Sequence, residues 1–164
     1  MEFGAAGPLA GRRRRPTPES LPCGLGGWRP GLRHNSVNLC VHLVWRTWDS
    51  LPIIEPGCER RLHRAMEAEA QDMGCTVHAI GGTAEHVHLL VSIPPTLAVS
   101  DLVKHVKGTT SKFANEVLMP GRFRWQGHYG AYSLSPEDLY VVKEYIRRQK
   151  EHHAEGHLIP ALEE

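Results

Sequence analysis

Two short segments of the chain carry side chains suited to phosphoryl-transfer chemistry. His86 and His88 lie two residues apart inside an apolar run, and Tyr145 lies further along with Gln149 four residues after it. Imidazoles bind divalent cations, and a tyrosine hydroxyl can act as a nucleophile. Together these groups are the parts needed to break a phosphodiester through a covalent link between protein and DNA.

The two histidines are predicted to share one face of a strand, because apolar residues alternate at period two from Glu85 to Ile93. One face then carries Val87, Leu89, Val91 and Ile93, and the other carries His86, His88, Leu90 and Ser92. Residues two apart on a strand face are roughly 6.6–7 Å apart, so both imidazoles can converge on one cation. The alternative is a strand with two half-exposed histidines, since the motif is short and the chain has 11 histidines.

The tyrosine is predicted to lie on a helix near the C-terminal end of the sequence. Ser135 is a suitable N-cap, Pro136 suits the first turn, and two acidic residues follow. Leu139, Val142 and Ile146 then recur at helical spacing and are predicted to face the core. Tyr145 and Gln149 are four residues apart and therefore share a face, although a tyrosine beside such a stripe is usually a packing residue.

Five segments that include these residues occur in an order typical of one protein family. They are His42-Leu43-Val44-Trp45, Glu85 to Val91, Val106 to Ser111, Trp125 to Ser133, and Tyr145 to His153. From Asn35 to Glu164 the chain resembles the single-tyrosine HUH transposases of small bacterial insertion sequences, and most of all the REP-associated tyrosine transposases. Many insertion-sequence members have a basic run after the first strand. This chain has Thr47-Trp48-Asp49-Ser50 there, which argues against a DNA contact from that loop.

The resemblance implies a specific chemistry. Mg²⁺ or Mn²⁺ would be held by His86, His88 and the side-chain oxygen of Gln149, with His42 near the ion but not bound to it. Tyr145 would attack phosphorus, leaving a 5′-phosphotyrosine and a free 3′-hydroxyl. The protein would thereby cleave and rejoin single-stranded DNA at hairpin-flanked sites. It would need no nucleotide cofactor, and no P-loop motif occurs in the sequence.

The resemblance also implies an assembly and a location. Members of the family work as homodimers in which the tyrosine helix of one subunit completes the metal site of the other. We therefore expect Tyr145 to act in trans. A bacterial cytoplasmic protein associated with the nucleoid is expected, without a membrane partner.

Four further residues are candidates for DNA contact. Lys104, Lys107 and Ser111 are predicted to cluster on one helix face, where they can contact phosphates or simply form a solvated surface. Trp125 can stack on a base, as aromatic residues do in proteins that bind single strands. The alternative for Trp125 is packing in the core.

The predicted elements follow the order β-α-β-β-α-β-α. Strands are expected at 37–45, 75–80, 85–93 and 123–133. Helices are expected at 56–73, from residue 100, and after residue 135. Gly81 and Gly82 are assigned to a turn, and the second helix is expected to bury Leu102, Val106, Phe113 and Val117. This order predicts an α+β fold with a ferredoxin-like antiparallel sheet, two helices on one face, and an extra C-terminal helix that brings the tyrosine to the other face.

Composition is consistent with this interpretation but does not identify it. Lys plus Arg number 19 against 18 acidic residues, so the net charge of +1 predicts local patches for DNA binding and no general affinity. The four cysteines show no Cys-x-x-Cys spacing and are interpreted as free thiols in a reducing compartment. No apolar run is as long as a membrane span, and no secretory signal is visible.

Residues 1–34 differ in composition from the rest and are predicted to be a disordered basic tail before a domain at 35–164. Glycine, proline and arginine dominate, with Arg12 to Arg15 at the centre. Such a composition buries too little apolar area to fold. The tail can be a basic arm that contacts phosphate or the result of a start site placed too early.

Two other classes of function compete with a transposase. One is a catalytically inactive protein that binds nucleic-acid hairpins on the same fold. The other is a histidine-based zinc hydrolase, which would require a third strong His, Cys or carboxylate ligand. A covalent adduct with DNA distinguishes the transposase from both.

Overall fold

The computed structural model describes residues 37–163. They lie within one compact unit, Ser36–Glu164. The predicted basic tail, with Arg12 to Arg15, lies outside the described residues, and its boundary with the domain remains a prediction.

The centre of the domain is a four-stranded sheet. Its strands are β1 (Cys40–Arg46), β2 (Thr76–Gly82), β3 (His86–Ser92) and β4 (Gly130–Leu134). They are arranged in the order β2-β3-β1-β4, and every neighbouring pair is antiparallel. This order is that of a ferredoxin-like sheet, so the predicted fold class is confirmed.

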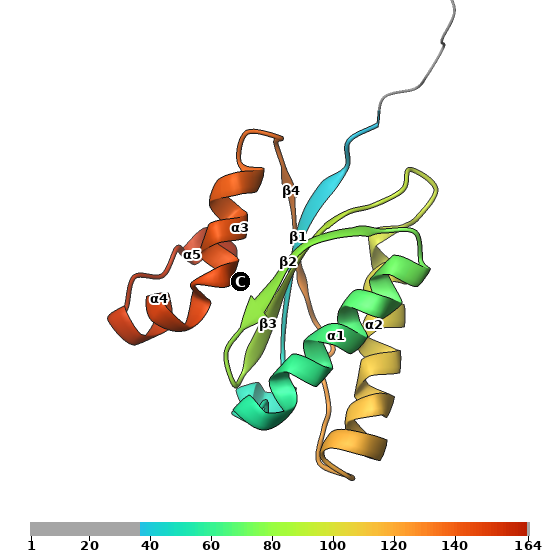
Figure 1. Ribbon diagram of the computed structural model, residues 1–164, viewed down its shortest axis with the longest axis vertical. Helices are drawn as coiled ribbons and strands as arrows, with labels where there is room; N and C mark the ends of the chain where they lie inside the picture. The colour runs from blue at the N-terminus through green and yellow to red at the C-terminus, as the bar shows by residue number, and fades with distance from the viewer. Residues whose placement is uncertain (1–36, 164) are drawn as a thin grey trace, which may run out of the picture. The chain divides into compact units, whose positions relative to one another are not determined.

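Helices cover both faces of this sheet. Helices α1 (Pro56–Asp72) and α2 (Val99–Phe113) lie on one side, and α3 (Leu139–Arg147), α4 (Gln149–Glu155) and α5 (Pro160–Glu163) lie on the other (Figure 1). A 3₁₀ turn, Trp48–Ser50, follows β1, and a π-helical turn, Ala114–Leu118, extends α2. The tyrosine helix therefore covers the sheet face opposite α1 and α2, as predicted.

The alternation of β3 divides the core into two parts. Val87, Leu89 and Val91 pack with α1 and α2 in the larger hydrophobic cluster. Leu90, on the opposite face, packs with Val142 and Ile146 of α3. The apolar stripe predicted for the tyrosine helix is thus buried where it was expected, and β3 connects both halves of the core.

Strands β1 and β4 are shorter than predicted. Strand β1 begins at Cys40 instead of Val37, and β4 begins at Gly130 instead of Phe123. The Asn115 side chain bonds both backbone polar groups of Phe123: Oδ1 accepts from its N–H at 2.9 Å and Nδ2 donates to its carbonyl at 2.6 Å. The Phe123 backbone is therefore unavailable for pairing with another strand.

The burial predicted for the second helix is correct only in its first half. Leu102 and Val106 are buried, Phe113 is half-buried, and Val117 is 49% exposed. Val117 lies in the π-helical turn, which changes the angular position of each residue around the helix axis. The 3.6-residue period used for the prediction does not hold there.

The glycine pair at Gly81-Gly82 lies inside β2, so its assignment to a turn was wrong. The connection to β3 is made by Thr83 to Glu85 instead. Gly81 is required by packing, because a Cβ at this position would lie 2.2 Å from the carbonyl oxygen of Ile146. The missing side chain lets the backbone of α3 approach β2 directly.

The C-terminal helix differs from the prediction in three ways. It begins at Leu139, because Ser135 accepts a hydrogen bond from the Asp138 N–H in a preceding turn instead of capping the helix. It is interrupted at Arg148, where φ is −101° and ψ is 18°. A short additional helix, α5, then returns the chain to the sheet.

Candidate metal and nucleophile site

Three buried histidines occupy the sheet face beneath α3 and α4. His42, from β1, and His86 and His88, from β3, have exposed fractions of 1% or less. The rings of His42 and His88 stack with centroids 5.1 Å apart, and His42 Nε2 lies 2.9 Å from His88 Nδ1. His86 Nδ1 lies 3.0 Å from the Thr83 hydroxyl. Both histidines of the His-x-His motif therefore have one nitrogen held by the protein and Nε2 directed away from that partner.

Tyr145 and Gln149 approach these histidines from α3 and the start of α4. Gln149 is 1% exposed, and its Nε2 lies 3.5 Å from His86 Nε2. The Tyr145 ring lies edge-on to His88, with centroids 6.5 Å apart. The interruption at Arg148 does not separate the two residues: their side chains meet at the same acceptor, described next.

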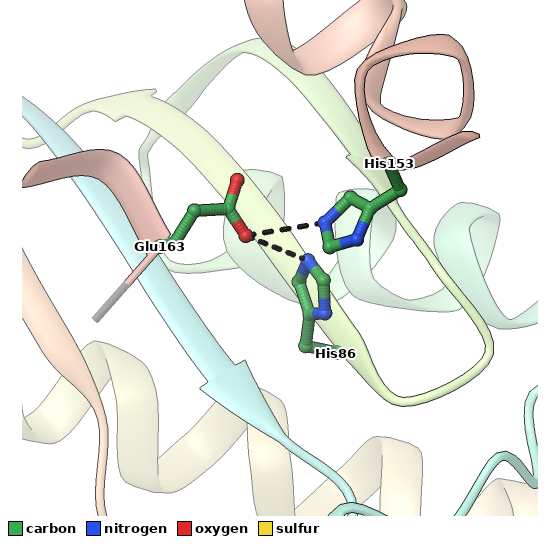
Figure 2. Close-up of side chains that lie close together, drawn as sticks. All are labelled: His86, His153 and Glu163. Atoms are coloured by element: carbon green, nitrogen blue, oxygen red, sulfur yellow. Dashed lines mark hydrogen bonds and ion pairs between the residues drawn. The ribbon is translucent and has the colours of Figure 1, made fainter. Parts of the chain in front are cut away.

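That acceptor is Glu163, at the end of α5. Its Oε1 accepts hydrogen bonds from the Tyr145 hydroxyl and from Gln149 Nε2, each at 2.5 Å. Its Oε2 lies 3.4 Å from His86 Nε2 and 3.2 Å from His153 Nε2 (Figure 2). The carboxylate thus lies between the tyrosine hydroxyl and the histidines.

His152 and His153, on α4, are half-buried and also contact this site. The ring of His152 stacks on Tyr145, with centroids 4.8 Å apart. His153 contacts both Glu163 and His86, and its ring centroid lies 4.9 Å from that of His86. Because α4 begins after the interruption at Arg148, this turn faces the sheet.

Burial shifts the ionisation of the site. It lowers the pKa of His42 and of His86 to about 4 and that of His88 to about 2, with Glu163 opposing the shift at the first two. These three imidazoles are therefore neutral at neutral pH, which is the form that binds a metal. Burial, followed by the hydrogen bond to Glu163, raises the pKa of the Tyr145 hydroxyl, so it carries its proton.

Glu163 itself remains ionised. Burial raises the pKa of its carboxyl, but the hydrogen bonds from Tyr145 and Gln149 and the nearby His86 and His153 outweigh burial and lower it overall. The site therefore combines neutral imidazoles with one negative charge.

Two buried polar atoms test whether this site suits a divalent cation. His88 Nε2 and Gln149 Oε1 are buried and have no hydrogen-bond partner. An unpartnered polar atom in the interior is costly, and a cation would satisfy both of these. Together with His86 Nε2 they form a set of nitrogen and oxygen donors suited to a divalent ion, so the residues fit the predicted metal.

The predicted DNA-contact residues are spread over a different part of the molecule. Lys104 is exposed and Ser111 is half-buried, both on α2 across the sheet from Tyr145. Lys107 Nζ donates hydrogen bonds to the carbonyls of Gln126 and His128 at 2.6 and 3.0 Å. Trp125 is 6% exposed, and its indole N–H donates to the Thr110 hydroxyl at 3.1 Å. Trp125 is therefore a core residue in this fold.

The sequence analysis identified neither Glu163 nor His153 as a site residue. No local pattern brings residue 163 next to residue 86, because the chain must first reverse after α4. The only available signal was Pro160 followed by Leu162, a helix start with one apolar anchor. In the structure Leu162 packs on the cluster of Leu90, Val142 and Ile146.

Comparisons with known proteins identify the family of the chain. The family of IS200-like transposases matches residues 35–149, so the chain belongs to that family. No curated protein matches the chain.

Two solved structures share the fold. A protein from Deinococcus radiodurans assigned as a transposase has 21% identity and a TM-score of 0.58, over 74% of this chain and 98% of that one. A REP-associated tyrosine transposase bound to a REP hairpin has 13% identity and a TM-score of 0.57, over 76% of this chain and 74% of that one. The family resemblance inferred from the motifs is confirmed.

Two further observations concern the predicted environment of the chain. Cys40, Cys58 and Cys75 are buried and free. Within residues 37–163, no helix is long and apolar enough to cross a membrane.

Proposed function

We propose that this transposase is a divalent-metal-dependent enzyme that cleaves and rejoins single-stranded DNA at hairpin-flanked sites through a 5′-phosphotyrosine. One observation carries the proposal. The hydroxyl of Tyr145 and the amide of Gln149 meet on one carboxylate oxygen, and that carboxylate faces His86. A nucleophile and a metal-ligand set from separate elements thus share one buried site.

The chain's own groups account for the proton and bond changes. The Tyr145 oxygen attacks phosphorus, and its proton passes to Glu163 Oε1, the acceptor already 2.5 Å away. The bond between phosphorus and the 3′-oxygen breaks, and the 3′-oxygen takes up the proton that Glu163 accepted, which restores the carboxylate. The backbone N–H of Ile159 donates to the Tyr145 hydroxyl at 3.2 Å, which keeps that oxygen in place.

His86, His88 and the side-chain oxygen of Gln149 are proposed to hold Mg²⁺ or Mn²⁺. When bound, the ion polarises the phosphoryl oxygens and offsets the charge that develops on them. His42 is proposed to orient His88 through the contact at 2.9 Å.

The substrate and the assembly are also proposed. Single-stranded DNA hairpins are the proposed partner, in keeping with the hairpin bound to the REP-associated transposase of the same fold. The homodimer with Tyr145 in trans remains a prediction. Within one chain Tyr145 already lies beside His88, so catalysis in trans would require two chains to exchange α3 and α4. DNA contacts of Lys104 and Ser111 remain predictions too, and a location at the bacterial nucleoid follows from the proposed substrate.

The alternative function, a zinc hydrolase, requires a third strong ligand beside the two histidines of the motif. His153 and Glu163 provide candidates for that ligand beside His86. The position of Tyr145 favours the transposase, since its hydroxyl lies beside the histidines and is bonded to a carboxylate that can accept its proton.

The experiment uses labelled single-stranded hairpin DNA taken from the flanks of the protein's own gene. Incubation with the full chain and Mn²⁺ should give a protein–DNA adduct that resists SDS, with the label retained only when it lies 3′ of the cut. Hairpin binding without an adduct would support the inactive binding protein. Cleavage without an adduct would support the hydrolase.

A further inference from the structure

The carboxylate of Glu163 is buried, and its ion-pair partners are histidines instead of lysine or arginine. The residue is 8% exposed. Among residues 37–163, its carboxylate forms ion-pair contacts only with histidines, and neither lysine nor arginine takes part. Arg46 comes near, but its guanidinium donates to the Glu163 backbone carbonyl at 3.5 Å. A bound cation would therefore stabilise this buried carboxylate.

The distances around Glu163 resemble those between ligands of one ion. His86 Nε2 is 3.4 Å from Oε2, His153 Nε2 is 3.2 Å from Oε2, and His88 Nε2 is 3.8 Å from Oε1. Good hydrogen bonds between nitrogen and oxygen are roughly 2.7–3.2 Å long. Around an octahedral ion with bonds near 2.1 Å, neighbouring ligand atoms are about 3 Å apart and opposite ones about 4.2 Å. All three separations fall within that range, and the contact of His153 at 3.2 Å is also a hydrogen bond.

The hydrogen bonds of the imidazoles leave one nitrogen, His88 Nε2, without a partner, and they leave His86 Nε2 facing Glu163. His88 uses Nδ1 for its contact with His42, and its Nε2 has no partner. His86 uses Nδ1 for its contact with the Thr83 hydroxyl. A neutral imidazole that donates through Nδ1 presents a lone pair at Nε2. A cation between His88 Nε2 and the Glu163 carboxylate would provide the partner that this nitrogen lacks.

We propose that Glu163 and His153 are ligands of the same divalent cation as His86 and His88. The inference rests on the proposed function and deepens it by assigning two ligands outside the predicted set. Oε2 of Glu163 faces the imidazoles, and Oε1 holds the Tyr145 hydroxyl, so one carboxylate links the ion to the nucleophile.

This ligand set has a consequence for metal choice. Together with the amide oxygen of Gln149, three imidazoles and one carboxylate form a set rich in nitrogen. Imidazole suits first-row transition metals, whereas Mg²⁺ prefers oxygen ligands and retains its water. The site therefore selects Mn²⁺ over Mg²⁺.

The test measures Mn²⁺ binding to the full chain without DNA, by the loss of the free-ion signal in electron paramagnetic resonance. Glu163→Gln and His153→Gln are compared with Glu155→Gln and His157→Gln, two exposed positions on the same side of the fold. Both site variants should bind Mn²⁺ about tenfold or more weakly than the wild type. Both control variants should bind like the wild type, and excess Mg²⁺ should displace Mn²⁺ poorly.

Melting curves in EDTA distinguish a variant that lacks a metal ligand from a variant that no longer folds. If Glu163→Gln melts at a much lower temperature than the wild type, His153→Gln still provides the test. Equal or tighter Mn²⁺ binding by a folded Glu163→Gln protein overturns the proposal and identifies the carboxylate as a group that blocks the site. Unchanged binding by His153→Gln also overturns it. If no DNA adduct forms with any variant while Mn²⁺ binding still depends on Glu163, the proposed function fails and the ligand assignment stands.

Discussion

The Tyr145 hydroxyl, on α3, donates a hydrogen bond to Oε1 of Glu163, on α5, 2.5 Å away. This contact connects the proposed nucleophile to a residue that no sequence motif includes. It places the phenolic proton on the path to an acceptor, and it holds the hydroxyl beside the histidines of β3.

The histidine pair should be required for metal binding and cleavage but not for folding. His86→Ala and His88→Ala should each weaken Mn²⁺ binding and reduce adduct formation by orders of magnitude, because each removes a ligand nitrogen. His105→Ala is the control, since His105 pairs with Glu69 on the α1–α2 side of the sheet. Full cleavage in EDTA would show that the metal takes no part.

Gly81 should allow the tyrosine helix α3 to approach β2, because glycine has no side chain between the two backbones. Gly81→Ala places a Cβ against the Ile146 carbonyl, which must move. We expect a loss of about 1–3 kcal/mol in the free energy of unfolding and a larger loss of cleavage than of hairpin affinity. Gly108→Ala is the matched control because nothing lies within 4 Å of its added Cβ and the site is helical, where alanine is favoured. Equal stability of both variants would contradict the packing argument.

Stability without metal should fall as the pH decreases below 6.5. Burial lowers the pKa of His42 and His86 from 6.5 to about 4, so between these values the unfolded chain binds protons that the folded chain does not. Stability is therefore complete above pH 6.5 and is lost towards pH 4, by up to about 1.4 kcal/mol per pH unit for each such group.

Melting temperatures in EDTA from pH 7.5 to 4.5 measure this dependence. His42→Gln should flatten the curve. An unaltered slope in His42→Gln would show that His42 is not the group titrating.

Catalysis in trans is tested by mixing two inactive proteins. Tyr145→Phe retains the metal ligands, and His86→Ala retains the tyrosine. If two chains exchange α3 and α4, the mixed dimer has one intact site, and adduct formation should partly recover. Absence of recovery, after subunit exchange has been confirmed with labelled chains, would place the tyrosine in cis, as it lies within the single chain.

The strands and their order could be predicted from the sequence because alternation in β1 and β3 defines both faces of the sheet. The same alternation predicted that the histidines lie opposite α1 and α2. The position of Gly81 within a strand could not be predicted, because the glycine is required by contact with the backbone of Ile146, which is distant in sequence. The ends of β4 and the first turn of α3 were misjudged because the side chains of Asn115 and Ser135 compete for backbone groups there.

The site residues that are close together in sequence could be predicted, whereas those that reach the site only through a reversal of the chain could not. His86 with His88, and Tyr145 with Gln149, are close in sequence, and the fold brings the two pairs together. Glu163 and His153 join the site only because α4 follows an interruption and α5 returns to the sheet. The spacing of residues in the sequence predicts neither the interruption nor the return of the chain to the sheet.

The central claim is that Tyr145 is the nucleophile, and the most direct measurement is to identify the residue that carries DNA. The adduct formed with hairpin DNA and Mn²⁺ is digested, and mass spectrometry locates the nucleotide on the peptide. We expect a 5′-phosphate on Tyr145. Tyr145→Phe should form no adduct while binding the hairpin normally, and Tyr140→Phe, at a position 72% exposed, should react like the wild type. DNA attached to any other residue, or an adduct that persists in Tyr145→Phe, would contradict the account.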